Sequence, residues 1–219
     1  WTDNPLSLLA GYDPSRFYVA FSAGFLTPPF YAPNVPLYSR LSKLGYIMGH
    51  ELTHGILMLY DEGNSNLALS FWDPFPHVFE QVECTMAHYR QLNTTPVVDY
   101  TQRKKFSEDY ADAGGFNLAY AAYRNSTRGI LEPMLPGLGN FTTEQLFFLS
   151  YAQNWCENLD IPLATNLFQK DIHSPGINRV LGVLRNSEEF SRAWNCPTTS
   201  FMNPENKCHL WKRSSETVN

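Results

Sequence analysis

The chain has 219 residues, 43% of them hydrophobic and 15% aromatic, which is enough apolar material for one packed domain and excludes disorder over most of its length. Its formal net charge of −5 arises from 16 Lys and Arg against 21 Asp and Glu without a basic block, which argues against nucleic acid or an anionic membrane surface as a partner. No run of about 18 apolar residues is present and no signal-peptide pattern opens the chain, so we expect a soluble chain without a membrane span.

Residues 1–36 favour loops and short strands over helices, because Pro and Gly interrupt this region repeatedly. The interrupting residues are Pro5, Gly11, Pro14, Gly24, Pro28, Pro29, Pro33 and Pro36. Two short aromatic and apolar runs, 8–12 and 16–20, flank the turn sequence at 13–15, and this pattern predicts a hairpin or a pair of edge strands joined by a tight turn. An edge strand of such a hairpin can hold an extended peptide by main-chain hydrogen bonds when it lies near an active site.

The sequence GHELTHG at 49–55 lies within an apolar stretch whose spacing predicts a helix from about 38 to 59. In a helix, His50 and His54 lie one turn apart on the same face, where both imidazoles can bind one Zn²⁺. Two imidazoles and a carboxylate leave a fourth position for water, whose pKa the metal lowers to about 7, and Glu51 would accept its proton. The alternative is that both histidines are ordinary helix residues with hydrogen-bonded rings.

The remaining chain favours helices, and the sequence TTEQ at 142–145 is typical of a helix N-terminus. The further predicted helices are 78–93, 106–124, 142–155 and two short ones near 179–184 and 188–194. We therefore expect a mainly α protein with a small β element, folded as a single catalytic domain. Its parts are a strand and loop region at the substrate edge (1–36), a helical zinc-binding region (37–211) and a tail (212–219).

A catalytic zinc site needs a third protein ligand, and the predicted helix 106–124 can supply it. Glu108 and Asp112 are four residues apart and share one helix face. Glu108 could bind the metal while Asp112 accepts a hydrogen bond from the free ring N–H of a zinc-bound histidine. The alternative is an ordinary solvated acidic face, which is common on helices.

Cysteines and glycosylation signals bear on the compartment. The four cysteines are far apart and form no C-x-x-C pair, which favours disulfides over a structural zinc site, although three pairings are possible. The alternative is four reduced thiols in a cytosolic protein. Three N-glycosylation acceptors give mild support for secretion: Asn93, Asn125 and Asn140.

Several segments together resemble the C-terminal catalytic part of the neprilysin family of zinc metallopeptidases, which includes the endothelin-converting enzymes. The matching segments are AGFLTPPF (23–30), GHELTHG (49–55), EDYADAGG (108–115), LPGL (135–138), QLFFLSYAQNWC (145–156), HSPG (173–176) and MNPENKCHLW (202–211). The resemblance implies a thermolysin-like, mainly helical domain of the gluzincin type, an extracellular location and hydrolysis of short peptides.

Matched position by position, the resemblance implies that one Zn²⁺ per chain is bound by three ligands: His50, His54 and Glu108. It makes Glu51 the general base and Asp112 the residue that orients a ligand. It adds His173 as the donor to the oxyanion of the tetrahedral intermediate, a kind of contact whose loss commonly costs about 3 kcal/mol of barrier. It also adds Arg179 as a group that binds a substrate carbonyl.

The resemblance also implies residues that bind substrate. Phe30, Ile47 and Trp155 occupy positions where the family lines the pocket for the residue after the scissile bond, which implies a preference for large apolar side chains; the alternative is that all three are ordinary core residues. The Ala10 backbone occupies the family's substrate-binding strand. There the family reads Asn-Ala-x-Tyr, whereas this chain has Leu9, which lacks a side-chain donor or acceptor.

Further departures follow the zinc helix and concern the length. The family has Phe-Asp-Asp where this chain has ILM at 56–58, and Asn154 stands where apolar residues are usual. The chain matches roughly the last third of a full member, so we expect a missing N-terminal segment or a second chain to supply the rest. In full members the cysteines matching Cys84 and Cys208 pair with each other. Those matching Cys156 and Cys196 bond to the missing part, so here they would be free, paired together or bonded to another chain.

The sequence thus predicts a zinc metalloendopeptidase that acts on short peptides. The alternative is a catalytically impaired secreted relative that serves as a peptide-binding or decoy module, because Leu9 and the missing cap weaken substrate handling. The enzyme is favoured because six positions with an inferred chemical role keep a suitable residue type: His50, Glu51, His54, Glu108, Asp112 and His173.

Overall fold

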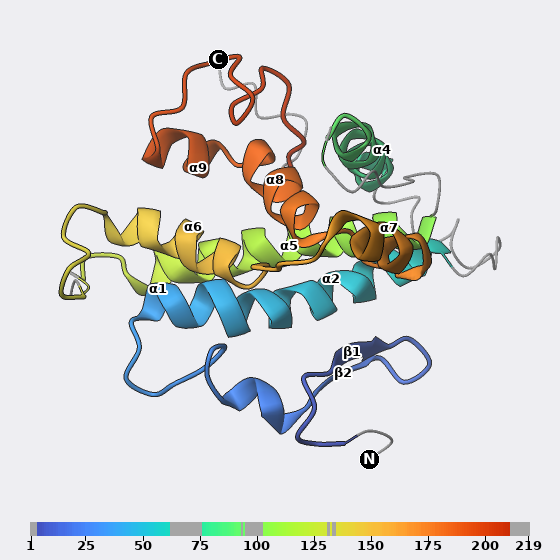
Figure 1. Ribbon diagram of the computed structural model, residues 1–219, viewed down its shortest axis with the longest axis horizontal. Coiled ribbons are helices and arrows are strands. Elements are labelled where there is room, and N and C mark those ends of the chain that lie inside the picture. Colours follow the sequence, from blue (N-terminus) through green and yellow to red (C-terminus); the bar gives the residue numbers. More distant parts are fainter. Residues whose placement is uncertain are drawn as a thin grey trace.

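The computed structural model describes residues 4–61, 76–92, 94, 103–130, 132 and 135–210 (Figure 1). In this part of the chain the two longest helices, α2 (Tyr46–Asp61) and α5 (Arg103–Ser126), run side by side through the middle of the molecule. A small hairpin lies on the α2 side of this pair (Figure 1). The opposite side carries α4 (Pro76–Arg90), α6 (Thr143–Gln153), α8 (Gly176–Asn186) and α9 (Glu188–Ala193).

The hairpin consists of β1 (Ala10–Asp13) and β2 (Tyr18–Phe21), which pair antiparallel with Ala10 opposite Phe21. The Asp13 carboxylate accepts hydrogen bonds from the backbone N–H groups two and three residues further on, at 2.9 and 3.2 Å, and this Asx turn reverses the chain. The predicted hairpin is confirmed, with strands that begin and end one or two residues later than the sequence predicts. A short 3₁₀ helix, η1 (Ala23–Leu26), follows it.

The helix that carries the GHELTHG sequence begins upstream in two shorter pieces. α1 (Leu37–Arg40) continues into a π-helical segment, η2 (Leu41–Gly45), which leads into α2. The predicted helix is confirmed, but one turn of it is wound more widely than an α-helix. The Asn154 amide donates a hydrogen bond to the Ser42 carbonyl in this wide turn at 3.0 Å, which gives the unusual polar side chain at 154 a structural role.

α2 and α5 approach closely where two glycines face each other. A Cβ added to Gly49 would lie 2.9 Å from Gly115 Cα, and a Cβ added to Gly115 would lie 2.5 Å from the backbone nitrogen of His50. Real Cβ atoms do not tolerate such distances, so the absence of side chains at these two positions permits the contact. The close approach coincides with the GHELTHG sequence, which brings α5 side chains next to its histidines.

The core is largely aromatic and lies mainly between α5 and α6. Phe116 of α5 lies with its ring centroid 4.9 Å from that of Tyr151, and Tyr120 stacks on Phe148 at 5.6 Å. Aromatic side chains bury about 150–250 Å² each, so this cluster contributes much of the stabilisation. The predicted N-terminus of α6 is confirmed, because Thr142 and Gln145 form a reciprocal capping box.

One α-helix of the described chain is not predicted from the sequence, and neither is the short 3₁₀ helix η1, which lies in the region expected to hold only loops and strands. α7 (Ile161–Lys170) begins after Asp160, whose carboxylate accepts a hydrogen bond from the Leu163 N–H at 2.8 Å. An acidic N-cap followed by a proline in the first turn is a common helix start, so the sequence did carry a signal for it. Among the described helices, none combines the length and the apolar character that crossing a membrane requires.

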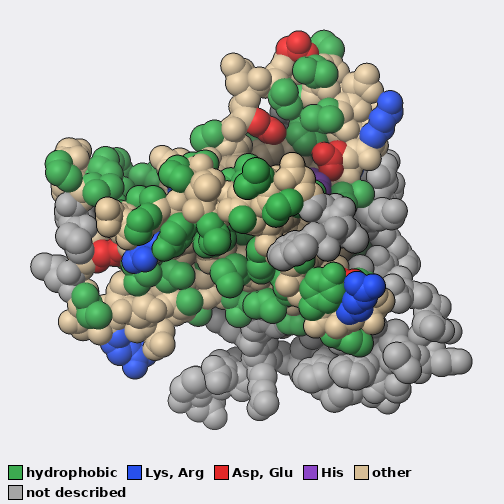
Figure 2. Space-filling model, turned by 90° about the horizontal axis from the view of Figure 1, so that it is seen from below, with side chains coloured by type: hydrophobic (Ala, Val, Ile, Leu, Met, Phe, Trp, Pro, Cys, Tyr) green, Lys and Arg blue, Asp and Glu red, His purple; other side chains and the backbone are tan. Residues whose placement is uncertain are grey.

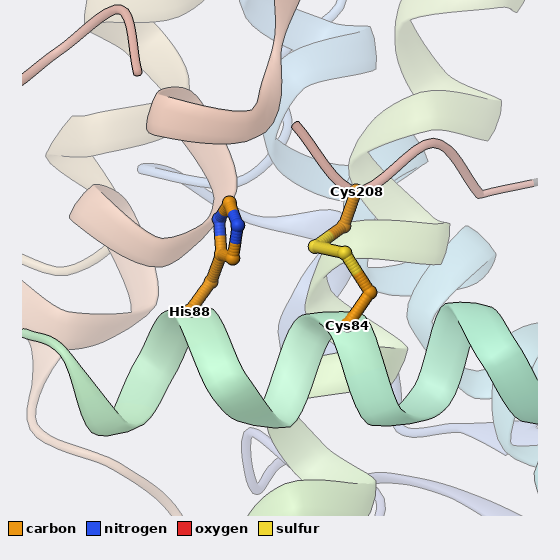
Figure 3. A group of neighbouring side chains, drawn as sticks. All are labelled: Cys84, His88 and Cys208. Carbon is orange, nitrogen blue, oxygen red and sulfur yellow. A yellow bond between two sulfur atoms is a disulfide. The ribbon is translucent and has the colours of Figure 1, made fainter. Parts of the chain in front are cut away.

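A disulfide joins α4 to the C-terminal segment. It links Cys84 to Cys208, which confirms the pairing that the resemblance implied (Figure 3). His88 lies one helical turn after Cys84 and near both sulfur atoms. Because these sulfurs are bonded to each other, they are not thiolates that could bind a metal with His88. Cys156 is exposed and Cys196 half-buried, and neither forms a disulfide within the described residues.

Candidate metal centre

Three side chains from α2 and α5 converge on one point. The Nε2 atoms of His50 and His54 lie 3.1 Å apart, and Glu108 Oε2 lies 3.2 Å from the first and 3.4 Å from the second. The ligands of a tetrahedral zinc site with bonds of about 2.0–2.1 Å are separated by about 3.3 Å. The side chains are also largely buried, with exposed fractions of 6%, 13% and 10%. The donor set and its spacing therefore fit a zinc ion.

The contacts of Glu108 support the same conclusion. Its Oε2 atom is buried, and no hydrogen bond of good geometry reaches it although imidazoles surround it. Burial alone would raise the pKa of this carboxyl, but the contacts with His173 and His50 outweigh burial and lower the pKa strongly. An ionised, buried carboxylate oxygen without a hydrogen-bond donor is a suitable metal ligand.

Behind His50, an ionised carboxylate fixes the orientation of its ring. Asp112 Oδ1 lies 2.8 Å from His50 Nδ1, and the Tyr46 hydroxyl donates to the same oxygen. Burial would raise the pKa of Asp112, but the neighbouring Arg179 guanidinium and His50 lower it to about 2. An ionised Asp112 accepts the proton on Nδ1, so the lone pair of His50 Nε2 faces Glu108 and is available to a metal.

Arg179 is part of this network. Its Nε donates to Asp112 Oδ2 at 2.6 Å and its Nη2 donates to Oδ1 at 2.5 Å, while its guanidinium lies 3.8 Å from the centre of the Trp155 ring. The side chain is only 8% exposed. No sequence pattern predicted the pair of Arg179 with Asp112, and the contact between Arg179 and a substrate carbonyl stays a prediction.

Glu51 follows His50 directly on α2 and is buried. Burial raises the pKa of its carboxyl, and the two neighbouring histidines His50 and His54 oppose that shift. A pKa above the ordinary carboxyl value suits a general base, because such a group accepts a proton more readily.

The predicted oxyanion donor also lies at this centre. His173 Nε2 is 3.3 Å from Glu108 Oε2, and its Nδ1 is 2.8 Å from Asp171 Oδ1. Contact with Glu108 raises the pKa of His173, more than burial lowers it. Its side chain is 42% exposed, so it is open to solvent where His50 and His54 are not.

The predicted substrate-binding residues lie in different settings. Ala10 belongs to β1, which packs against α2, and a hollow of about 460 Å³ beside the hairpin is lined in part by Leu9, Ala10 and Tyr12. Ile47 and Trp155 are half-buried against the main core. Phe30 packs edge-on against Phe25 at 5.0 Å. The pocket role of Phe30, Ile47 and Trp155 stays a prediction.

Sequence reasoning missed two residues that contact the centre. Tyr46 precedes His50 by one helical turn, so the i, i+4 spacing that linked the two histidines could have identified it. Asp171 lies two residues before His173, a local spacing that also carried a signal.

Comparisons with known proteins agree with this geometry. A family model described as peptidase family M13 matches residues 10–210. The chain is 35% identical to Caenorhabditis elegans neprilysin-21 and 36% identical to rat endothelin-converting enzyme 1, in each case over 96% of this chain and 28% of the relative. Homo sapiens neprilysin is 34% identical over 96% of this chain and 29% of its own length. The chain thus spans less than a third of these curated relatives.

Solved structures share the fold. The Haemonchus galactose-containing glycoprotein complex has a TM-score of 0.81 and 25% identity, covering 96% of this chain and 36% of the matched chain. The zinc metalloprotease Zmp1 of Mycobacterium tuberculosis has a TM-score of 0.77 and 22% identity, covering 97% of this chain and 34% of the other. The expected mainly α, gluzincin-type fold is confirmed. The chain belongs to peptidase family M13.

Proposed function

We propose that this member of peptidase family M13 is the catalytic part of a zinc-dependent endopeptidase that hydrolyses short peptides. The observation that carries the proposal is the convergence of His50, His54 and Glu108, whose ligand atoms lie 3.1–3.4 Å apart. Because the chain spans 28% of neprilysin-21 and of endothelin-converting enzyme 1, the activity of such relatives supports the proposal without deciding it.

A zinc ion held by these three side chains would supply Lewis-acid activation of water and of the scissile carbonyl. Glu51 accepts a proton from the attacking water as the new C–O bond forms. It then passes that proton to the amide nitrogen as the C–N bond breaks. His173 donates a hydrogen bond to the substrate oxygen that becomes negative, which its exposed position beside Glu108 permits.

Substrate binding is assigned to the hairpin side. β1 pairs with β2 along one edge in the two-stranded sheet, and its other edge, at Ala10, pairs with the backbone of an extended peptide. Phe30, Ile47 and Trp155 receive a bulky apolar side chain after the scissile bond. Figure 2 shows hydrophobic side chains spread over much of the described part of the face seen from below.

The proposed location is extracellular, as a secreted protein or as part of an ectodomain. The disulfide between Cys84 and Cys208 supports it, because disulfides persist in oxidising compartments. Cys156 is exposed and therefore accessible to a cysteine of an N-terminal segment or a second chain.

A second candidate is a relative that binds peptides without cleaving them. It is favoured by Leu9, which is 50% exposed at the start of the substrate strand and offers no side-chain hydrogen bond. The retention of Glu51 and of all three ligands argues for the enzyme.

The test combines zinc analysis with cleavage of a quenched fluorescent peptide library. About one zinc per chain, with cleavage by the native chain that is lost in Glu51→Gln, would support the enzyme. Glu205→Gln, which alters an exposed carboxylate of the C-terminal segment, is the matched control and should keep full activity. Peptide binding without cleavage would favour the binding module, and a chain that binds no zinc would exclude the zinc-dependent mechanism.

A further inference from the structure

We propose that Lys105 and Asp109 of α5 are positioning residues that anchor the 171–174 segment and thereby hold His173 beside Glu108. The inference deepens the proposed function, because it assigns residues that support its oxyanion donor. Lys105 is only 1% exposed, whereas lysine side chains usually reach solvent. A buried ammonium is costly unless hydrogen bonds compensate it.

The hydrogen bonds of Lys105 go to the backbone of the 171–174 segment. Its Nζ donates to the carbonyl oxygen of Asp171 and, at 3.3 Å, to that of His173. Hydrogen bonds from a charged donor are stronger than neutral ones. The two bonds therefore fix the backbone on both sides of residue 172, so the residue that carries the oxyanion donor and its partner Asp171 are held together.

Asp109 provides a second anchor one helical turn further along α5. The Ser174 hydroxyl donates to Asp109 Oδ2 at 3.0 Å, and both side chains are buried. Lys105 and Asp109 are four residues apart and thus lie on the same side of the helix. Together they hold three of the four residues of the 171–174 segment against one side of α5.

The same helix also carries the proposed ligand. Glu108 precedes Asp109 directly, and its Oε2 lies 3.3 Å from His173 Nε2. One rigid helix therefore sets both the position of the ligand and that of the donor. The His173 ring itself bonds to Asp171, which lies on the same segment, so this bond cannot hold the segment in place. Anchoring from α5 supplies what the local hydrogen bond lacks.

The main test variant is Lys105→Met, which keeps the length of the buried side chain and removes its donors. We expect kcat/KM to fall about 10- to 100-fold, mainly through kcat, with the zinc content unchanged because no ligand is altered. Lys105→Arg restores a buried cationic donor and should recover part of kcat.

Lys207→Met is the matched control. Lys207 Nζ likewise donates to a backbone carbonyl, that of Arg185 at 2.8 Å, and to the Ser191 hydroxyl at 3.1 Å. Loss of these two hydrogen bonds in Lys207→Met should lower thermal stability and leave kcat unchanged. An equal fall of kcat in Lys207→Met and Lys105→Met would show general destabilisation and overturn the positioning role.

Hydrogen exchange gives a readout that does not depend on activity. In the zinc-loaded chain, the backbone amides of 171–174 should exchange several-fold faster in Lys105→Met than in the native chain, and at the native rate in Lys207→Met. Ser174→Ala, a smaller change, should accelerate the same amides to a lesser degree. Unaltered exchange in both Lys105→Met and Ser174→Ala would overturn the proposal even if the native chain cleaves peptides. A native chain without cleavage would instead overturn the proposed function, and faster exchange would still support the anchoring.

Discussion

The two sides of the candidate centre are built differently. On the ligand side, α2 and α5 carry His50, His54 and Glu108 on buried helix faces, pressed together at paired glycines. On the proposed substrate side, the β1–β2 hairpin and the 171–174 segment present exposed groups, such as Leu9 at 50% and His173 at 42%. The proposed metal ligands, which must keep fixed distances, lie on long helices, whereas the groups proposed to meet a substrate lie on short segments that other elements hold.

The largest expected effect comes from removing the carboxylate ligand. In Glu108→Gln, zinc affinity should fall at least 100-fold and peptide cleavage at least about 1,000-fold, because the metal supplies several kcal/mol of transition-state stabilisation. Zinc content after dialysis and kcat/KM measure the two effects. Glu83→Gln, an exposed carboxylate on α4, is the control. Undiminished zinc in Glu108→Gln would contradict the ligand assignment.

The next effect tests whether the ligand side needs its close helix contact. Gly115→Ala places a Cβ 2.5 Å from the His50 backbone nitrogen, so the free energy of unfolding should fall by about 2–3 kcal/mol. Gly139→Ala has open space around the added methyl group and should change the free energy of unfolding by less than about 0.5 kcal/mol. Denaturant titration of both variants measures the difference. Equal stabilities would show that α2 and α5 can separate without cost.

A smaller effect should follow the loss of one hydroxyl behind His50. Tyr46→Phe removes a donor to Asp112 while keeping the buried ring, so zinc affinity should fall up to about 10-fold. Tyr120 lies further along α5 than Glu108, and its hydroxyl donates to Glu144 of α6. Tyr120→Phe removes that hydroxyl and should leave zinc affinity unchanged. Competition with a chromogenic chelator measures both affinities. An equal decrease of zinc affinity in Tyr46→Phe and Tyr120→Phe would mean that the Tyr46 hydroxyl acts through the general stability of the fold.

The smallest expected effect lies on the substrate side. Leu9→Asn introduces the hydrogen-bonding side chain of the family's substrate strand, so KM should fall about 3- to 10-fold with kcat unchanged. Leu8→Asn makes the same change at a neighbouring residue that is 57% exposed and should leave KM unchanged. Steady-state kinetics on one peptide compare the two. A change in kcat would show that the two sides of the centre are not independent.

The ligand side was the more predictable one. Helical spacing alone placed His50, His54, Glu108 and Asp112 on two faces, because a helix converts sequence separation into direction. The hairpin and most helices were predicted, with ends that differ by a few residues. Their predicted roles in substrate binding and catalysis stay predictions.

Features that depend on contacts between distant segments could not be predicted. The pair of Arg179 with Asp112 and the bonds of Lys105 to the 171–174 segment join residues more than 60 positions apart, and no local pattern encodes them. The disulfide partners could not be chosen by spacing, since three pairings were open, and only the resemblance indicated the correct one. The hydrogen bond from Asn154 to the π-helical turn of η2 likewise joins residues 112 positions apart.

The disulfide between Cys84 and Cys208 has a consequence for cleavage of this chain by other proteases. The two cysteines enclose a covalent ring that contains Glu108, Asp112 and His173, while His50 and His54 lie outside it. A single backbone cut anywhere within the ring leaves both pieces tied together. Even a chain cleaved between Glu108 and His173 therefore remains one covalent molecule. The two fragments, and with them the residues of the centre, can dissociate only if the disulfide is also reduced.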